Sequence, residues 1–124
     1  MKYDISALGN ALVDTQYKVD QSFLSEIGLE ADSMTLSSAD EQAPIINKLI
    51  KMGSESMSDC GGSATNSLVA AANYGSKCHH VCRVADDEDG RKYLDSLRSA
   101  GVEHIGISSK NADMPTGKCL ILVT

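Results

Sequence analysis

The sequence predicts an α/β fold, in which short apolar strands alternate with amphipathic helices along 124 residues. Residues 3–8, 77–84 and 116–123 have the apolar content and pattern of strands. Residues 63–74 and 87–100 carry apolar side chains at helical spacing, and a glycine follows each segment. Helices that alternate with strands in this way pack on a sheet, so we expect one modest domain.

Composition limits the classes of function. The chain is 42% hydrophobic with no Trp and one Phe, so its core must be aliphatic. A net charge of −6 and a pI of about 4.9 disfavour nucleic acid or an anionic membrane surface as a partner. No apolar run is long enough to span a bilayer, and Gly9, Asn10 and Asp14 interrupt the N-terminal stretch, unlike a signal peptide. We therefore expect a cytoplasmic protein whose four cysteines are free thiols.

The first predicted strand, Tyr3 to Leu8, ends at Gly9 and leads to two polar candidates, Asn10 and Asp14. Open α/β folds place ligand-binding groups just beyond the carboxyl ends of their strands. A carboxylate there can accept two hydrogen bonds from the hydroxyls of one sugar diol. The residues alone leave a second interpretation open, in which Asn10 makes a turn and Asp14 is a solvated strand residue.

The next stretch of the chain predicts small elements. Residues 22–27 have the pattern of a short helix, and residues 34–36 that of a short strand. Ser38 and Glu41 have the spacing of a capping box before an apolar stripe, which consists of Ile45, Ile46, Leu49 and Ile50. Because Pro44 fits best in a first helical turn, this helix is expected to begin slightly later than the box alone would place it.

Two glycines, Gly61 and Gly62, deliver the chain into the helix that Gly75 ends. At its start, free N–H groups and the positive end of the helix dipole face one spot. Asn66 projects from the first turn at that spot, with both a donor and an acceptor. The turn is not a Walker A loop, since the Gly-Lys-Ser/Thr end is missing. The glycine spacing also excludes a nicotinamide-binding domain.

Two clusters that could suggest a metal site predict ordinary structure instead. Residues 78–82, Cys-His-His-Val-Cys, have no second pair of close ligands, which favours a buried strand with incidental thiols over a zinc site. His79 and His80 are accordingly expected to be ordinary strand residues. The acidic run at 86–89 suits a helix N-terminus, and Leu97 stands where a calcium loop would need Glu. We therefore predict no metal site. Further along the chain, we predict a strand at residues 103–108 and a loop at residues 109–115.

Four segments together resemble the ribokinase-like (PfkB) family of sugar and nucleoside kinases. GGSATNSLVAAANYG at 61–75 resembles the first signature of the family, and GNALVD at 9–14 resembles its adenosine kinase branch. ADDEDGRKYLDSLRSAGV at 85–102 is similar to the D-x-x-G segment of the family, although Ala85 stands where Gly or Asn is usual. TGKCLILVT at 116–124 resembles the Thr-Gly strand of nucleoside kinases. The segments follow the order and spacing of the family across the whole chain.

The resemblance implies a ribokinase-like three-layer α/β/α core with a small β-sheet lid, of which residues 1–124 would be the N-terminal part. Lid strands are expected at approximately 14–20, 33–37 and part of 103–122, and they allow a homodimer formed through the lid. The resemblance implies ATP and Mg²⁺ as cofactors. The ATP-binding half of the family and its catalytic aspartate belong to a C-terminal portion that these residues do not contain. The chain alone is therefore expected to be inactive.

The resemblance also implies substrate-binding roles, and no catalytic residue within the chain. The Asn and Asp that contact the ribose hydroxyls in the family correspond to Asn10 and Asp14. The base pocket would include Leu12 and Cys119. The glycine turn and the first helical turn would close around the same sugar through Gly61, Gly62 and Asn66.

Two functions from different classes are compatible with this sequence. The first is an ATP-dependent phosphotransferase that acts on the primary hydroxyl of a nucleoside or sugar, with adenosine as the favoured substrate. The alternative is a non-catalytic nucleoside- or sugar-binding or interaction module derived from a truncated kinase. Both functions predict a small-molecule partner.

Overall fold

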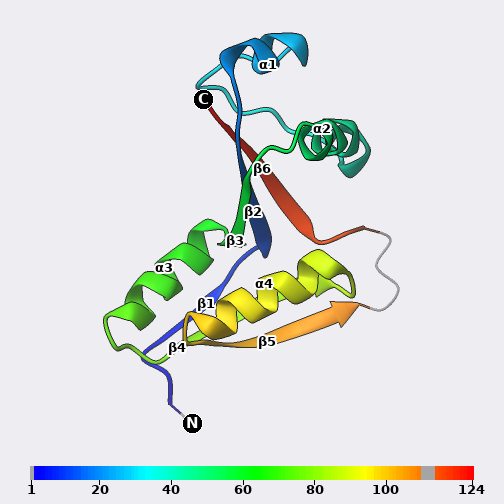
Figure 1. Ribbon diagram of the computed structural model, residues 1–124. Helices are drawn as coiled ribbons and strands as arrows, with labels where there is room; N and C mark the ends of the chain where they lie inside the picture. Colours follow the sequence, from blue (N-terminus) through cyan, green and yellow to red (C-terminus); the bar gives the residue numbers. More distant parts are fainter. Residues whose placement is uncertain (1, 110–113) are drawn as a thin grey trace. The chain divides into compact units, whose positions relative to one another are not determined.

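The computed structural model describes residues 2–109 and 114–124, and it places the side chains of these residues except those of 106–109. The chain forms a mixed α/β structure, which confirms the predicted fold class (Figure 1). It divides into two compact units, Met1–Asp14 with Ser58–Cys119 and Thr15–Met57 with Leu120–Thr124. The elements are β1 (Ile5–Leu8), β2 (Leu12–Lys18), α1 (Gln21–Glu26), α2 (Ala39–Lys51), β3 (Ser56–Gly61), α3 (Ser63–Asn73), β4 (Cys78–Ala85), α4 (Glu88–Ser99), β5 (Val102–Ser109) and β6 (Gly117–Val123).

The first unit is built on a parallel sheet with the strand order β1-β4-β5. Alternate residues of β4 are buried, and they pack with side chains of both α3 and α4, so the two helices lie on the same face of the sheet. The core is aliphatic apart from one tyrosine and three cysteines, and it contains neither Trp nor Phe. Its buried members are Ala11, Val13, Cys60, Leu68, Cys78, Cys82, Val84, Tyr93, Leu97 and Val102.

A row of apolar side chains crosses the opposite face of this sheet. Leu8 pairs with Val81, and Val81 pairs with Ile105, so the three side chains point to the same side. Leu8 is 82% exposed and Ile105 is 62% exposed. Within the first unit both helices therefore cover one face of the sheet and leave this apolar row open to solvent.

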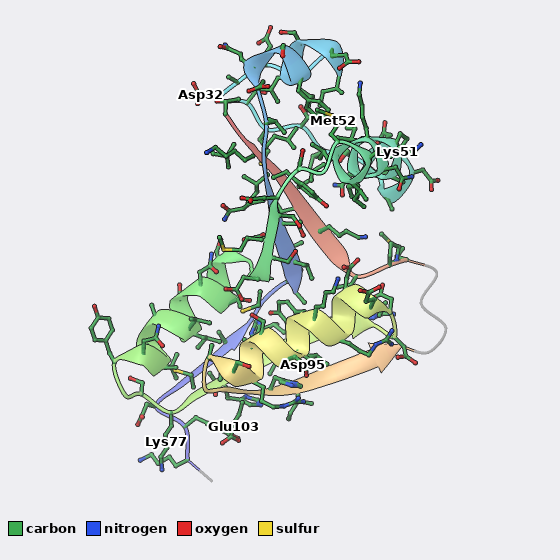
Figure 2. The ribbon with its side chains drawn as sticks, viewed as in Figure 1. Asp32, Lys51, Met52, Lys77, Asp95 and Glu103 are labelled. Atoms are coloured by element: carbon green, nitrogen blue, oxygen red, sulfur yellow. The ribbon has the colours of Figure 1, made fainter. Side chains whose placement is uncertain are left out.

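Side-chain bonds link the starts of the three parallel strands. The Tyr3 hydroxyl donates to the Glu103 carboxylate at 2.6 Å, and the Lys77 backbone N–H donates to the Asp4 carboxylate at 2.8 Å. Figure 2 shows Lys77 and Glu103 at this end of the unit. The Tyr3 ring also stacks on His79, with ring centroids 4.7 Å apart. His79 thus has a structural contact, in line with the prediction that it is an ordinary strand residue.

The helices of the first unit begin and end as their sequences predict. Gly75 and Gly101 follow α3 and α4 with positive φ angles of 93° and 79°, which glycine adopts without strain. Asp87 caps α4, since its carboxylate accepts a hydrogen bond from the Gly90 N–H at 2.7 Å. Among residues 2–109 and 114–124, no group of three or more His, Cys, Asp or Glu residues could hold a metal ion.

The second unit packs α1 and α2 around a small core of its own. Tyr17, Phe23 and Leu49 are its buried apolar residues. The predicted capping box is present at the start of α2, where the Ser38 N–H donates to the Glu41 carboxylate at 2.7 Å and the Glu41 N–H donates back to the Ser38 hydroxyl.

Helix α2 departs from its prediction in two details. It begins at Ala39, directly after the capping box, so Pro44 lies inside the helix instead of in its first turn. Ile50, which was expected on the apolar stripe, is 61% exposed. Figure 2 labels Lys51 and Met52 at the end of this helix. No helix in the described part of the chain is long and apolar enough to cross a membrane.

A second sheet has the strand order β3-β2-β6. Two of the stretches assigned to the lid, 14–20 and part of 103–122, overlap β2 and β6. The strand expected at 33–37 was wrong, because these residues form no strand and their Met34 and Leu36 side chains are exposed. Strand β3 was not predicted, since its first four residues are polar or exposed and show no alternation. Of the expected loop at 109–115, residues 110–113 lie outside the described residues.

Candidate functional site

The carboxyl end of β1 meets the start of α3 at closely packed glycines. A Cβ added to Gly62 would lie 2.8 Å from the carbonyl oxygen of Asn10, and Gly62 has a φ of 101° that disfavours any other residue. A Cβ added to Gly9 would lie 2.6 Å from the Cβ of Ala64. These contacts place the backbone of Asn10 against the glycine turn.

Asp14 lies against the other glycine of the turn. A Cβ added to Gly61 would overlap the Asp14 carboxylate, so only glycine leaves room for this side chain. Asp14 belongs to β2, and it is half-buried. The interpretation of Asp14 as a strand residue is therefore correct as far as secondary structure goes, but the strand brings its carboxylate to the glycine turn.

The environment of the Asp14 carboxyl also shifts its pKa. Partial burial raises the pKa of Asp14, and the negative charge of Asp59 raises it further. The pKa of Asp59 itself is lowered, chiefly by the hydrogen bond that it accepts from the Ser96 hydroxyl. The sequence does not indicate this effect of Asp59 on the pKa of Asp14. Residues 54–60 show no strand pattern, so the sequence predicts only a segment that leads into the glycine turn and does not predict β3.

Leu12 and Cys119 lie on neighbouring strands beside Asp14. A Cβ added to Gly117 at the start of β6 would lie 2.7 Å from the Leu12 side chain, so Leu12 packs directly on the backbone of β6. Partial burial raises the pKa of the Cys119 thiol, and the charge of Asp14 raises it further, which places the thiol within electrostatic reach of the carboxylate. Leu12 and Cys119, the two residues predicted for the base pocket, thus lie close to Asp14, the residue predicted to bind the diol.

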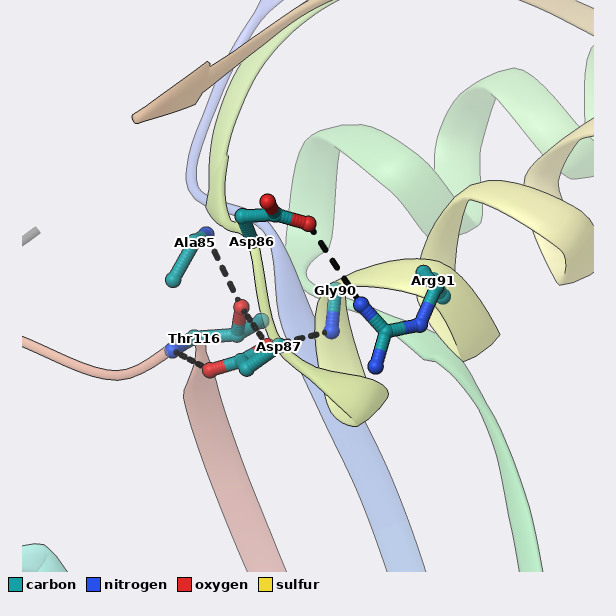
Figure 3. Close-up of polar contacts among 6 residues, drawn as sticks. All are labelled: Ala85, Asp86, Asp87, Gly90, Arg91 and Thr116. Atoms are coloured by element: carbon teal, nitrogen blue, oxygen red, sulfur yellow. Dashed lines mark hydrogen bonds and ion pairs between the residues drawn. The ribbon is translucent and has the colours of Figure 1, made fainter. Parts of the chain in front are cut away.

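A hydrogen-bonded bracket holds the start of β6 in place (Figure 3). The Asp87 carboxylate accepts from the Thr116 N–H at 2.9 Å, from the Thr116 hydroxyl at 2.7 Å and from the Gly90 N–H. The Thr116 hydroxyl in turn accepts from the Ala85 N–H at 3.0 Å. Asp87 therefore caps α4 and also fixes Thr116, which directly precedes the Gly117 contact with Leu12.

The N-terminus of α3 completes the set of candidate groups. Gly62 provides no side-chain cap, and the first intrahelical bond runs from the Asn66 N–H to the Gly62 carbonyl at 2.9 Å. The N–H groups of Ser63, Ala64 and Thr65 precede that bond and point out of the helix end. Asn66 itself is exposed in the first turn. This end of the helix suits an oxygen-rich or anionic ligand.

A separate cavity of about 440 Å³ lies between β2, β3 and α4. It is lined by Val13, Ser58, Asp59, Lys92, Asp95 and Ser96. None of the seven predicted site residues lines it. Its charged side chains are paired, since Asp59 accepts from Ser96, Asp95 pairs with Arg98 at 3.0 Å and Lys92 pairs with Glu88 at 2.8 Å.

Comparison with known proteins finds a matching family and several similar solved structures. The family model described as pfkB family carbohydrate kinase matches residues 33–124. A probable sugar kinase from Rhizobium etli is 27% identical over 98% of this chain and 36% of its own, with a TM-score of 0.77. An adenosine kinase from Sinorhizobium meliloti is 31% identical over 100% of this chain and 36% of its own, with a TM-score of 0.74.

A third similar structure is the Anopheles gambiae adenosine kinase in complex with P1,P4-di(adenosine-5) tetraphosphate. It is 28% identical over 96% of this chain and 35% of its own, with a TM-score of 0.78. The chain therefore spans about a third of the length of these solved proteins. No curated protein matches the sequence.

Proposed function

Because the chain belongs to the pfkB family of carbohydrate kinases, we propose that the complete protein is an ATP-dependent kinase and that this chain carries its substrate-binding portion. The acceptor would be the primary hydroxyl of a nucleoside or sugar, with adenosine as the favoured substrate. The observation that carries the proposal is the packing of Asp14 against Gly61 beside the packing of Asn10 against Gly62. The Asp14 carboxylate and the backbone carbonyl of Asn10 thereby lie against one glycine turn.

Each group in this arrangement suits a sugar diol. An ionised Asp14 would accept hydrogen bonds from two vicinal hydroxyls, and charge-assisted bonds of this kind are stronger than neutral ones. Asn10 and Asn66 would each offer a donor and an acceptor to the same sugar. The glycines would let the ring approach the backbone closely, because they present no side chain.

A nucleoside is favoured over a free sugar by the surroundings of Asp14. Leu12 packs on β6, and Cys119 lies near the carboxylate, so less polar groups flank the diol site. A base would use such groups, whereas a free sugar offers hydroxyls in every direction. The resemblance to two adenosine kinases supports the same choice.

The proposal assigns no ATP or Mg²⁺ site to the described residues of this chain. They hold no metal-binding cluster in residues 2–109 and 114–124, and the sequence has no Gly-Lys-Ser/Thr loop. In the proposal this chain therefore binds and orients the acceptor, and the nucleotide belongs to the remainder of a longer protein. We place that protein in the cytoplasm, where thiols such as that of Cys119 stay reduced.

The test is to express the complete gene product and to incubate it with Mg-ATP and a panel of adenosine, other ribonucleosides, ribose and fructose phosphates. We expect phosphorylation of the primary hydroxyl, fastest with adenosine. An immunoblot of the source cells against this segment accompanies the assay. A product near 13.1 kDa that binds adenosine but transfers no phosphate would favour the non-catalytic module instead.

A further inference from the structure

A buried chain of hydrogen bonds crosses the first unit behind the candidate site. The Tyr93 hydroxyl lies 2.8 Å from the Thr65 hydroxyl, and the Thr65 hydroxyl lies 3.2 Å from Nε2 of His80. On the other side of the ring, Nδ1 of His80 lies 3.3 Å from the carbonyl oxygen of Ala7. All three side chains are 0% exposed. The chain links α4, α3, β4 and β1 without contact to solvent.

The partners determine the direction of each bond. The Ala7 carbonyl can only accept, so Nδ1 of His80 must carry a proton and donate. The tautomer that carries its proton on Nδ1 leaves Nε2 able to accept from the Thr65 hydroxyl, so this tautomer satisfies both partners of the ring. Thr65 then donates to Nε2, and Tyr93 donates to Thr65. Every polar atom in the series has a defined role.

The two ends of the His80 ring connect the two segments that carry the candidate site. Ala7 lies three residues before Asn10, and Thr65 lies between Gly62 and Asn66. A Cβ added to Gly9 would also lie 3.4 Å from Cε1 of His80, so the ring packs on the end of β1. One imidazole therefore holds β1 and the first turn of α3 at a fixed separation and rotation.

We propose that His80 is a positioning residue for ligand recognition, which clamps β1 to α3 so that Asn10 and the Gly61-Gly62-Asn66 turn face the same diol. The proposal rests on the proposed function. A purely apolar contact would fill the same space, but it would not fix the direction of approach, since dispersion contacts are not directional. Breaking one bond leaves a buried polar atom unsatisfied, which the fold can relieve only by moving the two segments.

The clamp itself is tested without any ligand. Nitrogen-15 NMR of the complete gene product reports the tautomer of His80. We expect the neutral Nδ1–H form in the wild-type protein at pH 7. The Nε2–H form or an imidazolium would overturn the proposal, because neither matches the bond directions that the clamp requires.

The positioning role is tested with Thr65→Val, which removes the hydroxyl at nearly constant volume, and Thr65→Ser, which keeps the hydroxyl but loses a methyl group. Calorimetry gives the affinity for adenosine and for 2′-deoxyadenosine, which lacks one hydroxyl of the diol. We expect Thr65→Val to reduce the ratio of the two affinities at least about fivefold, or about 1 kcal/mol, and Thr65→Ser to preserve it. Thr35→Val, in an exposed coil, is the matched control.

The outcomes separate this proposal from the proposed function. If the wild-type protein shows no preference for adenosine over 2′-deoxyadenosine, diol recognition fails, and the positioning role of His80 fails with it. If the wild type discriminates and Thr65→Val discriminates equally, only the positioning role is overturned. Melting temperatures measured in parallel identify a structural role, because lost stability with an unchanged affinity ratio would also overturn positioning.

Discussion

The carboxylate of Asp14 occupies the space that a side chain at Gly61 would need. This relationship brings together two features that are far apart in the sequence. Strand β2 presents the carboxylate, and β3 presents the glycine beside it, in a sheet with the order β3-β2-β6. The glycine turn therefore makes room for a protein carboxylate.

We predict that Asp14→Asn weakens binding of adenosine about 10- to 100-fold, because a charged acceptor with two oxygens becomes an amide with one. Calorimetry on the complete gene product measures the change. Asp20→Asn, at an exposed position before α1, is the matched control and should leave the affinity unchanged. A loss smaller than about threefold for Asp14→Asn would remove Asp14 from the site.

The packing of Asp14 on Gly61 predicts a coupling that is independent of any ligand. Gly61→Ala should destabilise the wild-type protein, because the new methyl group collides with the carboxylate. In an Asp14→Ala background the same substitution should cost less by about 1 kcal/mol or more. Urea unfolding of the four variants gives the coupling, and additive effects within about 0.3 kcal/mol would contradict the contact.

The raised pKa of Asp14 predicts that this site reduces stability at neutral pH. The folded protein holds the Asp14 proton more tightly than the unfolded chain, so stability falls as the pH rises from the ordinary Asp value of about 4 through the folded pKa. Asp14→Asn should therefore raise the melting temperature at pH 7. The gain should disappear below about pH 4, where the wild-type carboxyl is protonated in both states.

A melting temperature for Asp14→Asn that is equal to or below that of the wild type at pH 7 would contradict this prediction. The same substitution is thus expected to gain stability and lose binding. Such opposite effects are common where a binding site holds a charged group in a partly buried position.

Much of this fold could be predicted because local patterns decide it. The capping box at Ser38, a helix cap within the acidic run at 86–89 and the glycines after α3 and α4 depend on a few neighbouring residues, and the structure contains all of them. The prediction of a strand at 33–37 was wrong because Met34, Thr35 and Leu36 form too short a pattern to specify a partner strand. Strand β3 was missed for the opposite reason, since backbone pairing with β2 forms it despite a polar, exposed sequence.

The candidate site, like the fold, could be predicted only in part from the sequence. Position after a strand and resemblance to a family were enough to propose Asn10, Asp14 and the glycine turn. The influence of Asp59 on Asp14 and the His80 clamp depend on which strands are neighbours, and the sequence carries no local signal for that. His80 was interpreted as an ordinary strand residue because its partners lie 15 and 73 positions away along the chain.

The bracket around Asp87 gives the last prediction. Burial raises the pKa of Asp87, but hydrogen bonds from Thr116 and Gly90 and the charge of Lys118 outweigh it, so the pKa lies below its ordinary value. Its contribution to stability is therefore present above about pH 4 and is lost as the pH falls through the folded pKa. Asn caps a helix as well as Asp does, so Asp87→Asn isolates the bonds to Thr116. We expect a loss of about 2 kcal/mol at pH 7 that shrinks on acidification.

Asp86→Asn, whose carboxylate makes one exposed contact with Arg91 at 3.4 Å, is the control. Urea unfolding from pH 7 to pH 3 measures both variants, and a pH-independent loss for Asp87→Asn would show that the charge of Asp87 does not hold β6 in place.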